Sequence, residues 1–370
     1  MRSRSEICRS AAHKLTEAIP SLSNTPALVG LDGFIDEIIA VVDTRKDAST
    51  YEPVRTISRL AEKIKDAAGE SSNYELVTKQ MKLGGNGPIM ANALAAIGLQ
   101  VTYIGNLGFP TLHPVFGELA SRATVVSIAE AAHTDALEFD DGKLMLGKMT
   151  PLTEVTWDHL VERVGRDRLA ALFRESRLTA LVNWTMLPFM TEIWRHLLSE
   201  VLTGGPRLSM FIDLADPEKR TPHDILEALD LLGRLQTCVD VTLGLNLKES
   251  NEILEVLGMA MPASPEAAIQ ATASTLRANL GLSCVVIHPR RAAAAATENE
   301  SGFFQGPFVE RPLISTGAGD HFNAGFSTAR LLGFDLEEAL CVGTATSGYY
   351  VRTASSPTAS QLAEFVENLP

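Results

Sequence analysis

Short apolar runs that are rich in β-branched residues alternate along the chain with longer segments in which apolar residues recur every three or four positions. The short runs are "ALVGLDGFI", "VTYIGNLG", "ATVVSIA", "LTALVNW", "RLSMFIDLA", "CVDVTLGLN" and "LSCVVIHP". Each of the last four precedes a helix-like segment, such as "MTEIWRHLLSEVL" or "DILEALDLLGRL". This order predicts an α/β fold in which helices cover both faces of a mostly parallel sheet.

Two stretches depart from that alternation. Residues 34–45 and 134–148 are typical of strands with exposed polar positions, and the second folds about Asp141-Gly142 as a hairpin. Together with a strand at about 75–84, they predict a small β-sheet off the main sheet, which we expect to act as a lid.

The ends of the chain suggest the domain organisation. The first twenty-odd residues are typical of a helix, and the connector "PSLSNTP" follows them. We therefore expect a helical extension over residues 1–25 and one α/β domain over 26–370. The stretch 290–304 is either a brief segment of biased composition or a strand beside an exposed loop.

The net charge limits which partners the protein can bind, and the cysteine content indicates its redox compartment. The chain has 32 Lys and Arg against 45 Asp and Glu, a net charge of −13, which argues against nucleic acid and anionic membranes. The cysteines Cys8, Cys238, Cys284 and Cys341 are far apart, which indicates free thiols in a reducing compartment. No apolar run approaches the roughly 20 residues that cross a bilayer, so we expect a cytoplasmic protein.

The stretch "STGAGDHFNAGF", residues 315–326, is the strongest candidate for chemistry. The run "FVERPLIS" before it predicts a strand. The apolar residues Phe322, Phe326 and Ala329 after it lie on one face of a predicted helix that ends at Gly333. The loop is therefore expected to join a strand to a helix.

Such a junction offers two interpretations of the loop. The first helical N–H groups lack intrahelical partners and the helix dipole favours an anion, so Gly317, Ala318 and Gly319 are candidates to bind phosphate. Alternatively, Asp320 satisfies those N–H groups and the glycines only form the turn. Taken alone, the loop slightly favours the second interpretation.

Other motifs narrow the choice. The sequence lacks G-x-x-x-x-G-K-[ST], a G-x-G-x-x-G after a strand, H-E-x-x-H and G-x-S-x-G. A second glycine-rich stretch, "KLGGNGPIMANALAAIGLQVTYIGNLG" at residues 82–108, lies between a possible strand and an alanine-rich helix. Seen alone, its glycines are explained as well by close packing of a helix on a sheet.

In this order and separation, the two glycine motifs resemble those of the ribokinase-like (PfkB) family of carbohydrate kinases. The resemblance runs from about residue 26 onward and implies a three-layer α/β/α ribokinase-like fold with a β-sheet lid. It implies that Asp320 is the catalytic base, that the amides of Gly317, Ala318 and Gly319 form an anion hole, and that ATP and Mg²⁺ are the cofactors. Phosphoryl transfer needs such a carboxylate and such positive groups around the phosphoryl.

The resemblance extends to the sugar-binding glycine pair, which corresponds to Gly84 and Gly85. The family usually shows Gly-Gly-x-x-x-Asn-x-Ala, and this chain has Ile89 where that asparagine belongs. We expect Asn86 or Asn92 to substitute for it, unless the substrate lacks the hydroxyl that the asparagine holds.

Further residues match the family's pattern. Asp36 corresponds to an aspartate that binds sugar hydroxyls, although without the family a water-facing strand residue is the better interpretation. Asn246 and Glu249 match an Asn-x-x-Glu motif tied to magnesium and phosphate, and the same spacing is close to a helix capping box. The resemblance also implies that Thr316 and Asn246 bind the nucleotide.

The chain departs from the family at two more places. Ile314 stands where an aspartate is common, and His288 with the two residues after it replaces a Thr-x-Gly that binds nucleotide phosphate. Arg290 or Arg291 would supply charge there instead, although an exposed arginine pair is usually a solvated surface. The stretch "SSPT" at 355–358 resembles the family's closing segment beside the adenine site.

These residues favour an ATP- and Mg²⁺-dependent kinase that phosphorylates a hydroxymethyl group of a sugar or sugar derivative. A nucleoside kinase of the same fold is the alternative substrate class. A non-catalytic regulatory protein that binds a sugar or nucleotide is the alternative of a different kind; Ile89, Ile314 and His288 favour it and Asp320 opposes it. The unpaired lid edge also suggests a homodimer.

Overall fold

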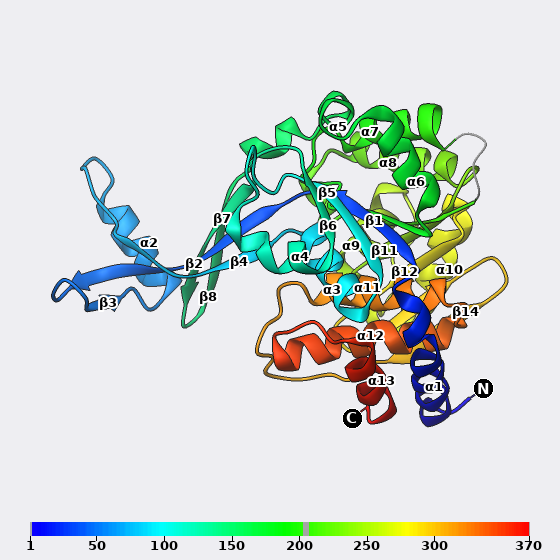
Figure 1. Cartoon of the computed structure of the whole chain (residues 1–370). Coiled ribbons are helices and arrows are strands. Elements are labelled where there is room, and N and C mark those ends of the chain that lie inside the picture. The colour runs from blue at the N-terminus through cyan, green and yellow to red at the C-terminus, as the bar shows by residue number, and fades with distance from the viewer. Residues whose placement is uncertain (1, 203–206, 370) are drawn as a thin grey trace.

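The computed structural model describes residues 2–202 and 207–369 (Figure 1). In these residues the strands form a nine-stranded sheet in the body of the molecule and a five-stranded sheet in an arm that projects from it. The body sheet has the order β14-β13-β12-β11-β10-β9-β1-β5-β6. Its strands are β1 (Pro26–Leu31), β5 (Gln100–Gly105), β6 (Thr124–Ser127), β9 (Leu178–Val182), β10 (Ser209–Asp213), β11 (Asp240–Leu245), β12 (Cys284–Ile287), β13 (Ala292–Ala296) and β14 (Ser301–Gln305).

The body sheet is mostly parallel, which confirms the expectation from the sequence. All neighbouring pairs from β6 to β12 are parallel, and the hairpin β13-β14 adds an antiparallel edge. The alanine-rich stretch therefore forms a strand beside an exposed loop. Because parallel strands point the same way, the segments that follow them meet at one edge of the sheet.

Helices cover both faces of the body sheet. One buried apolar cluster joins the sheet to α5, α6, α7, α8, α9 and α10, and another joins the opposite face to α1, α3, α4, α11, α12 and α13. Along β1, Leu28 faces the first cluster, whereas Ala27 and Val29 face the second. The α-helices are α1 (Arg4–Leu22), α3 (Asn86–Ile97), α4 (Gly117–Arg122), α5 (Trp157–Val164), α6 (Arg166–Glu175), α7 (Met190–His196), α8 (Pro222–Leu235), α9 (Leu247–Val256), α10 (Ile269–Leu280), α11 (Ala318–Leu331), α12 (Leu336–Thr353) and α13 (Ala359–Glu367), with α2 in the arm.

Five short segments complete the helical structure of the described residues. Four are 3₁₀ turns and one, η3, is a π turn that extends α7. They are η1 (Pro114–Phe116), η2 (Thr150–Glu154), η3 (Leu197–Val201), η4 (Pro217–Lys219) and η5 (Glu266–Ala268). None of the described helices is long and apolar enough to cross a membrane.

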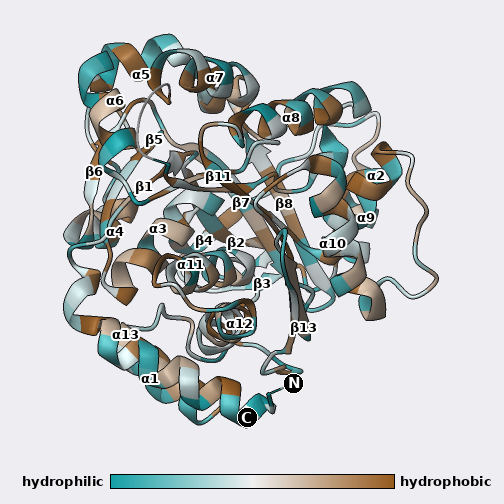
Figure 2. Cartoon of the chain, turned by 90° about the vertical axis from the view of Figure 1, so that its right-hand side faces the viewer, coloured by the Kyte–Doolittle hydropathy of each residue, from teal (hydrophilic) through white to brown (hydrophobic). Residues whose placement is uncertain are grey.

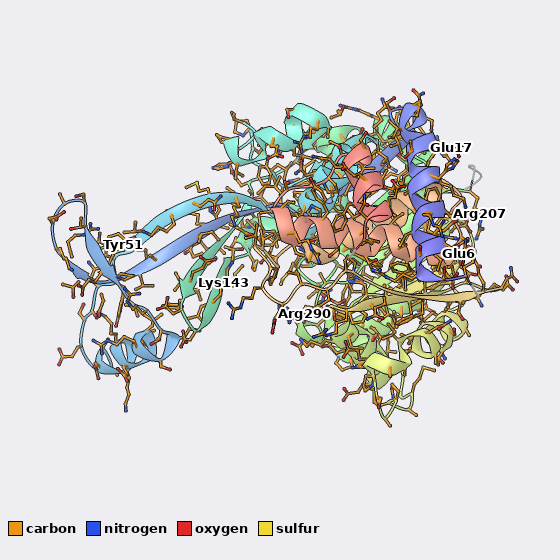
Figure 3. The ribbon with its side chains drawn as sticks, turned by 90° about the horizontal axis from the view of Figure 1, so that it is seen from below. Glu6, Glu17, Tyr51, Lys143, Arg207 and Arg290 are labelled. Carbon is orange, nitrogen blue, oxygen red and sulfur yellow. The ribbon has the colours of Figure 1, made fainter. Side chains whose placement is uncertain are left out.

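The arm is the expected small sheet, which we call the lid. It consists of β2 (Phe34–Arg45), β3 (Tyr51–Pro53), β4 (Leu76–Gly84), β7 (Ala132–Phe139) and β8 (Gly142–Lys148). Figure 3 shows Tyr51 toward the far end of the arm and Lys143 on β8. The lid also carries α2 (Ile57–Asp66), whose Leu60 packs with Ile39, Val41 and Leu137. The apolar residues Ile57, Leu60, Ala61 and Ile64 have helical spacing, although the elements expected from the sequence do not include this helix.

The N-terminal helix includes the first residues of the expected connector. α1 continues through Pro20 to Leu22, so the connector to β1 has only residues 23–25. Figure 2 shows α1 beside α13, outside the layer that contains α11 and α12. On α1, Lys14 forms a 2.6 Å ion pair with Glu338, whose side chain is 1% exposed, and Glu6 and Glu17 lie along the same helix (Figure 3). The helix is thus part of the body.

The strand expected directly before the loop at residues 315–326 is absent from the described structure. Residues 306–317 form an irregular segment, and the preceding strand β14 ends at Gln305. Pro307 and Pro312 have no backbone N–H to give to a sheet, and the side chain of Leu313 is 73% exposed. The apolar composition of "FVERPLIS" was misleading because Leu313 faces solvent.

Candidate functional site

The loop before α11 presents its amides to a cavity. α11 begins at Ala318, and Gly317 before it has φ of 88°, in the left-handed region that favours glycine. A Cβ atom on Gly317 would lie 3.1 Å from Cγ2 of Ile89 and 3.3 Å from the Tyr350 hydroxyl. Within the described residues no side chain caps this helix terminus. The Ala318 amide donates to the Ser315 carbonyl at 3.2 Å, whereas the amides of Gly317 and Gly319 make no hydrogen bond within the described residues and are candidates to bind an anion.

Asp320 lies in the first turn of α11 and is only 6% exposed. Its Oδ1 accepts a 3.0 Å hydrogen bond from the side-chain amide of Asn86, which is the first residue of α3. Burial, followed by the nearby carboxylate of Asp213, raises the pKa of Asp320 well above its ordinary value. A carboxylate with a raised pKa beside an anion site is suited to take the proton of an alcohol.

Asp213 is a second buried carboxylate at this place, and the sequence motifs do not include it. It ends β10 and accepts hydrogen bonds from Nδ2 of Asn323 at 2.8 Å and from the amide of Ala215 at 2.9 Å. Burial raises the pKa of Asp213 to about 6. Its only sequence signal is an aspartate at the carboxyl end of a buried parallel strand, where ligands of such sheets bind.

Glu249 is the third buried carboxylate. It accepts hydrogen bonds from the amides of Asn246 at 2.8 Å and Asp216 at 2.9 Å, and the Asn246 side chain accepts one from the Glu249 amide. Burial, followed by repulsion from Asp213, raises the pKa of Glu249 to about 8. The pair with Asn246 thus forms a capping box at the start of α9 and also places a carboxylate near Asp213.

The carboxylates of Asp213 and Glu249 fit a divalent cation. Mg²⁺ prefers oxygen ligands and is often held by one or two carboxylates together with substrate phosphates. Both carboxylates are buried, and each has a raised pKa because burial disfavours its charge. A bound cation would remove that penalty by favouring the ionised forms.

Two cavities meet beside these carboxylates. The first, of about 480 Å³, is lined by Gly317, Gly319 and Asp320, and the second, of about 430 Å³, lies between the lid and the body. Asn86 and Glu249 line both cavities. A larger cavity of about 910 Å³ lies at the opposite ends of β9 to β12 and contains none of these five residues. Its size therefore does not make it the site of the chemistry.

The second cavity is lined by three of the four residues expected to bind sugar, Asp36, Gly85 and Asn86, and Gly84 is not among the lining residues. Thr134 of the neighbouring strand β7 lines it as well. A Cβ atom on Gly84 would lie 2.5 Å from the Asp36 carboxylate, so only glycine lets β4 pass over it. Burial raises the pKa of Asp36, and a hydrogen bond from Thr134 opposes that shift.

Asp32 is a further buried carboxylate, which bonds to two residues of this cavity and belongs to none of the sequence motifs. It is 0% exposed and accepts hydrogen bonds from the amides of Asn86 at 3.0 Å and Gly87 at 2.9 Å and from Nδ2 of Asn183 at 2.7 Å. Burial raises its pKa to about 6. Asp32 thus fixes the turn that carries Asn86.

The structure separates the two asparagines that could replace the missing family residue. Asn86 lines both cavities, whereas the side chain of Asn92 accepts a hydrogen bond from Arg122 on α4. Ile89, which stands at the family's asparagine position, lies beside Gly317 in the loop before α11. Of the two candidates, only Asn86 is at the site.

The residues expected at the nucleotide are only partly brought together. Asn246 and Arg290 line the first cavity, and so does Arg291, whose guanidinium lies 3.7 Å from the ring centre of Phe308. Thr316 is exposed and is not among the lining residues. The segment 355–358 does not line the cavity either; its Ser356 bonds to the His321 ring at 2.8 Å.

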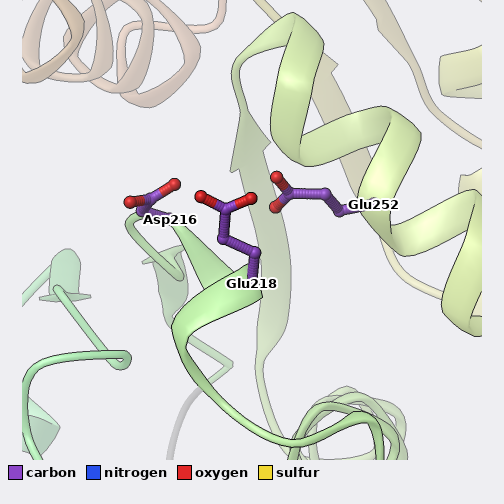
Figure 4. Close-up of side chains that lie close together, drawn as sticks. All are labelled: Asp216, Glu218 and Glu252. Carbon is purple, nitrogen blue, oxygen red and sulfur yellow. The ribbon is translucent and has the colours of Figure 1, made fainter.

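Another group of carboxylates lies nearby on the surface. Ligand atoms of Asp216, Glu218 and Glu252 lie within 4.8 Å of one another (Figure 4). The ammonium of Lys248 is 2.8 Å from Asp216, 2.5 Å from Glu218 and 3.4 Å from Glu252. A lysine thus already supplies the positive charge, and the group is an ion-pair network.

Known proteins share this architecture. The model of the prokaryotic ketohexokinase family matches residues 5–369. A ketohexokinase of Haloferax volcanii is 30% identical over 360 residues, which cover 96% of this chain and 94% of that protein. Ribokinase of Cryptococcus neoformans in complex with ADP has a TM-score of 0.64 at 18% identity and covers 92% of this chain and 99% of its own. Ribokinase of Thermotoga maritima has a TM-score of 0.62 at 17% identity, with coverages of 93% and 99%.

Proposed function

Because the chain belongs to the prokaryotic ketohexokinase family and is a carbohydrate kinase that uses ATP, we propose that its acceptor is a ketohexose. A hydroxymethyl group of the sugar receives the terminal phosphoryl group of ATP. The observation that supports this proposal is the meeting of two cavities at Asn86 and Glu249, with the buried Asp320 beside them. One cavity would hold the polyphosphate and the other the sugar.

We propose that Asp320, the loop amides and Asn86 act on the reacting groups themselves. Asp320 takes the proton of the attacking hydroxyl as the new oxygen–phosphorus bond forms and the bond to the leaving ADP breaks. The amides of Gly317, Ala318 and Gly319 stabilise the charge that develops on the transferring phosphoryl. Asn86 holds the carboxylate of Asp320 in place through its 3.0 Å hydrogen bond.

The cation and the sugar are held by other residues. Asp213 and Glu249 would hold Mg²⁺, which neutralises phosphate charge when bound. Asp36 accepts hydrogen bonds from sugar hydroxyls, with Gly84 and Gly85 leaving room for them. The lid lies over the second cavity and excludes water from the acceptor hydroxyl.

The test is ADP release from Mg-ATP with ketohexoses, aldohexoses, pentoses and nucleosides as acceptors, followed by phosphorus NMR of the product. We expect turnover with a ketohexose and a phosphate monoester at one of its two hydroxymethyl groups. Asp320→Asn should lower turnover by about 10²- to 10⁴-fold, whereas Asp158→Asn should not, since Asp158 is an exposed first-turn aspartate of another helix. Faster turnover with aldohexoses or nucleosides would refute the assignment of the substrate.

We also propose a homodimer that forms through the lid. The edge strands β4 and β8 each pair with one neighbour among the described strands, and Met81, Met145 and Leu146 on them are 52%, 49% and 52% exposed. Exposed apolar side chains and unpaired edges favour association. Sedimentation of the 39.9 kDa chain should give twice that mass, and Leu146→Lys should give a monomer. A monomeric parent at micromolar concentration would contradict the dimer.

Use of ATP and four free cysteines also support a cytoplasmic location, which we infer on those grounds. Fractionation of cells that produce the protein, with activity followed in each fraction, tests this inference.

A further inference from the structure

The hydroxyl of Tyr350 on α12 reaches the loop before α11. It donates a hydrogen bond to the Thr316 carbonyl at 3.1 Å, and it lies 3.3 Å from the position that a Cβ atom on Gly317 would take. Burial, followed by the charge of Asp320, raises the pKa of Tyr350 to about 12, so the hydroxyl keeps its proton at neutral pH. Tyr350 is therefore a constant donor to this carbonyl.

The Thr316 carbonyl and the Gly317 amide belong to the same peptide unit. The cis peptide bonds of the described residues lie elsewhere, so this unit is trans, and in a planar trans peptide the C=O and the N–H point in opposite directions. Gly317 lines the first cavity, whereas Thr316 and Tyr350 are not among its lining residues. The bond from Tyr350 thus holds the carbonyl away from the cavity and turns the Gly317 amide toward it.

The next peptide unit, between Gly317 and Ala318, is held at both ends. The Gly317 carbonyl accepts hydrogen bonds from the amide of His321 at 3.1 Å and from Nδ1 of its ring at 2.7 Å. The Ala318 amide donates to the Ser315 carbonyl at 3.2 Å. Because a carbonyl oxygen only accepts, Nδ1 of the neutral ring carries the proton, and Nε2 accepts from the Ser356 hydroxyl at 2.8 Å.

The ring of His321 in turn holds the tyrosine. The two rings stack with a centroid distance of 3.6 Å and an angle of 13°. Bonds at both nitrogens fix the imidazole, and stacking on it fixes the plane of the Tyr350 ring. Within residues 2–202 and 207–369, the Thr316 carbonyl has no hydrogen-bond donor other than Tyr350. The direction of the Gly317 amide therefore depends on one hydroxyl group.

We propose that Tyr350 is a positioning residue, which directs the Gly317 amide at the transferring phosphoryl group through the Thr316 carbonyl. The tyrosine itself touches neither substrate. The proposal rests on the proposed function for the anion hole, but not for the identity of the sugar.

The test compares two neighbouring tyrosines of α12. Tyr350→Phe keeps the ring that stacks on His321 and removes only the hydroxyl. Tyr349→Phe is the matched control, because the half-buried Tyr349 packs edge-on against Phe365 and its hydroxyl makes no hydrogen bond within the described residues. Turnover is measured with the best acceptor of the panel, thermal unfolding reports the fold, and crystal structures with Mg-ADP show the loop.

We expect Tyr350→Phe to lower kcat by about 3- to 30-fold, which is less than the roughly 10²- to 10³-fold for a donor that is lost completely, since the loop keeps its other contacts. The KM for the sugar and the pH dependence of kcat/KM should stay unchanged, because the change reaches neither the second cavity nor the Asp320 carboxylate. Tyr349→Phe should behave as the parent does, and both variants should keep the parent melting temperature.

A double variant separates positioning from general damage. Gly317→Ala displaces the amide that Tyr350 directs, so Tyr350→Phe should cost little further kcat when it is added to Gly317→Ala. A purely structural role of the hydroxyl predicts instead that the two losses multiply. Such an independent loss would overturn the proposal.

The other outcomes are equally distinct. An unchanged kcat in Tyr350→Phe, beside a loss in Gly317→Ala, would overturn the role of Tyr350 and leave the anion hole intact. An unchanged kcat in both variants would refute the anion hole and the role of Tyr350 together. If no acceptor gives turnover, a Gly317 amide that keeps its direction in the crystal structure of Tyr350→Phe would overturn the proposal. Turnover with other sugars but no ketohexose would refute the substrate assignment alone.

Discussion

The substitution Gly317→Ala separates the geometry of the anion hole from the stability of the fold. Gly317 has φ of 88°, and an alanine in such a conformation costs about 1–2 kcal/mol in the free energy of unfolding. Its Cβ would also lie 3.1 Å from Ile89, which is tight enough to displace the loop. A displaced loop misdirects its amides, and loss of one such donor lowers kcat by about 10²- to 10³-fold.

The same helix offers a matched control. Gly333 lies just beyond the end of α11 with φ of 78°, and a Cβ atom there would meet no described atom within 4 Å. Gly333→Ala therefore carries the backbone strain of Gly317→Ala without its contact and without any contact with the cavity. Both variants should lose a similar amount of stability, with falls of roughly 2–5 °C in the melting temperature.

The assay is steady-state turnover with saturating sugar, together with thermal unfolding of the parent and both variants. Only Gly317→Ala should lose kcat, and Ile89→Ala combined with it should restore part of the loss by making room for the new Cβ atom. If Gly317→Ala keeps the parent kcat, or loses no more than Gly333→Ala, the amides of this loop do not stabilise the transferring phosphoryl.

Three other substitutions have defined outcomes. Asp320→Asn should lower kcat by about 10²- to 10⁴-fold without lowering the melting temperature, because it removes a buried charge. In the parent, kcat/KM should decrease as the pH is lowered, with a pKa above the ordinary value for aspartate, since the base must be ionised. Gly84→Ala should raise the KM for the sugar and leave the KM for ATP unchanged, because the new Cβ atom displaces the Asp36 carboxylate 2.5 Å away; an equal rise in both values would contradict this. Glu249→Gln should raise the Mg²⁺ concentration needed for half-maximal turnover, and an unchanged requirement in a metal titration would show that Glu249 does not hold the cation.

The sequence predicted the fold correctly for those segments whose hydrophobic pattern matches their burial in the folded chain. The apolar β-branched runs became the buried strands of a mostly parallel sheet, and Phe322 and Phe326 lie in α11, which is buried on all sides from Asp320 to Ala329. The segment 306–317 was not predictable in this way. It has apolar residues but also two prolines, and whether Leu313 faces solvent depends on what packs beside it.

The candidate site likewise contains residues that the sequence could name and residues that it could not. Asp320, Gly317 and Glu249 belong to short local motifs and could be named from the sequence. Asp213 and Asp32 belong to no such motif, because their role arises only when distant segments meet. Asp213 bonds to a side chain 110 positions away and Asp32 to one 151 positions away.

The contacts of Asp32 attach the start of α3 to the body next to the place where the chain leaves the lid. The chain enters the lid at Phe34, leaves it at Gly84, enters it again at Ala132 and leaves it at Lys148. The first connection lies two residues after Asp32, and the second lies two residues before Asn86, whose amide Asp32 binds. Asp32 binds the amides of Asn86 and Gly87, which places the start of α3 with the body and not with the lid. Movement of the lid would therefore change the position of Asp36, which we propose binds the sugar, but not the hydrogen bond from Asn86 to Asp320. The glycines at 33, 84 and 85 lie where that change in backbone direction has to occur.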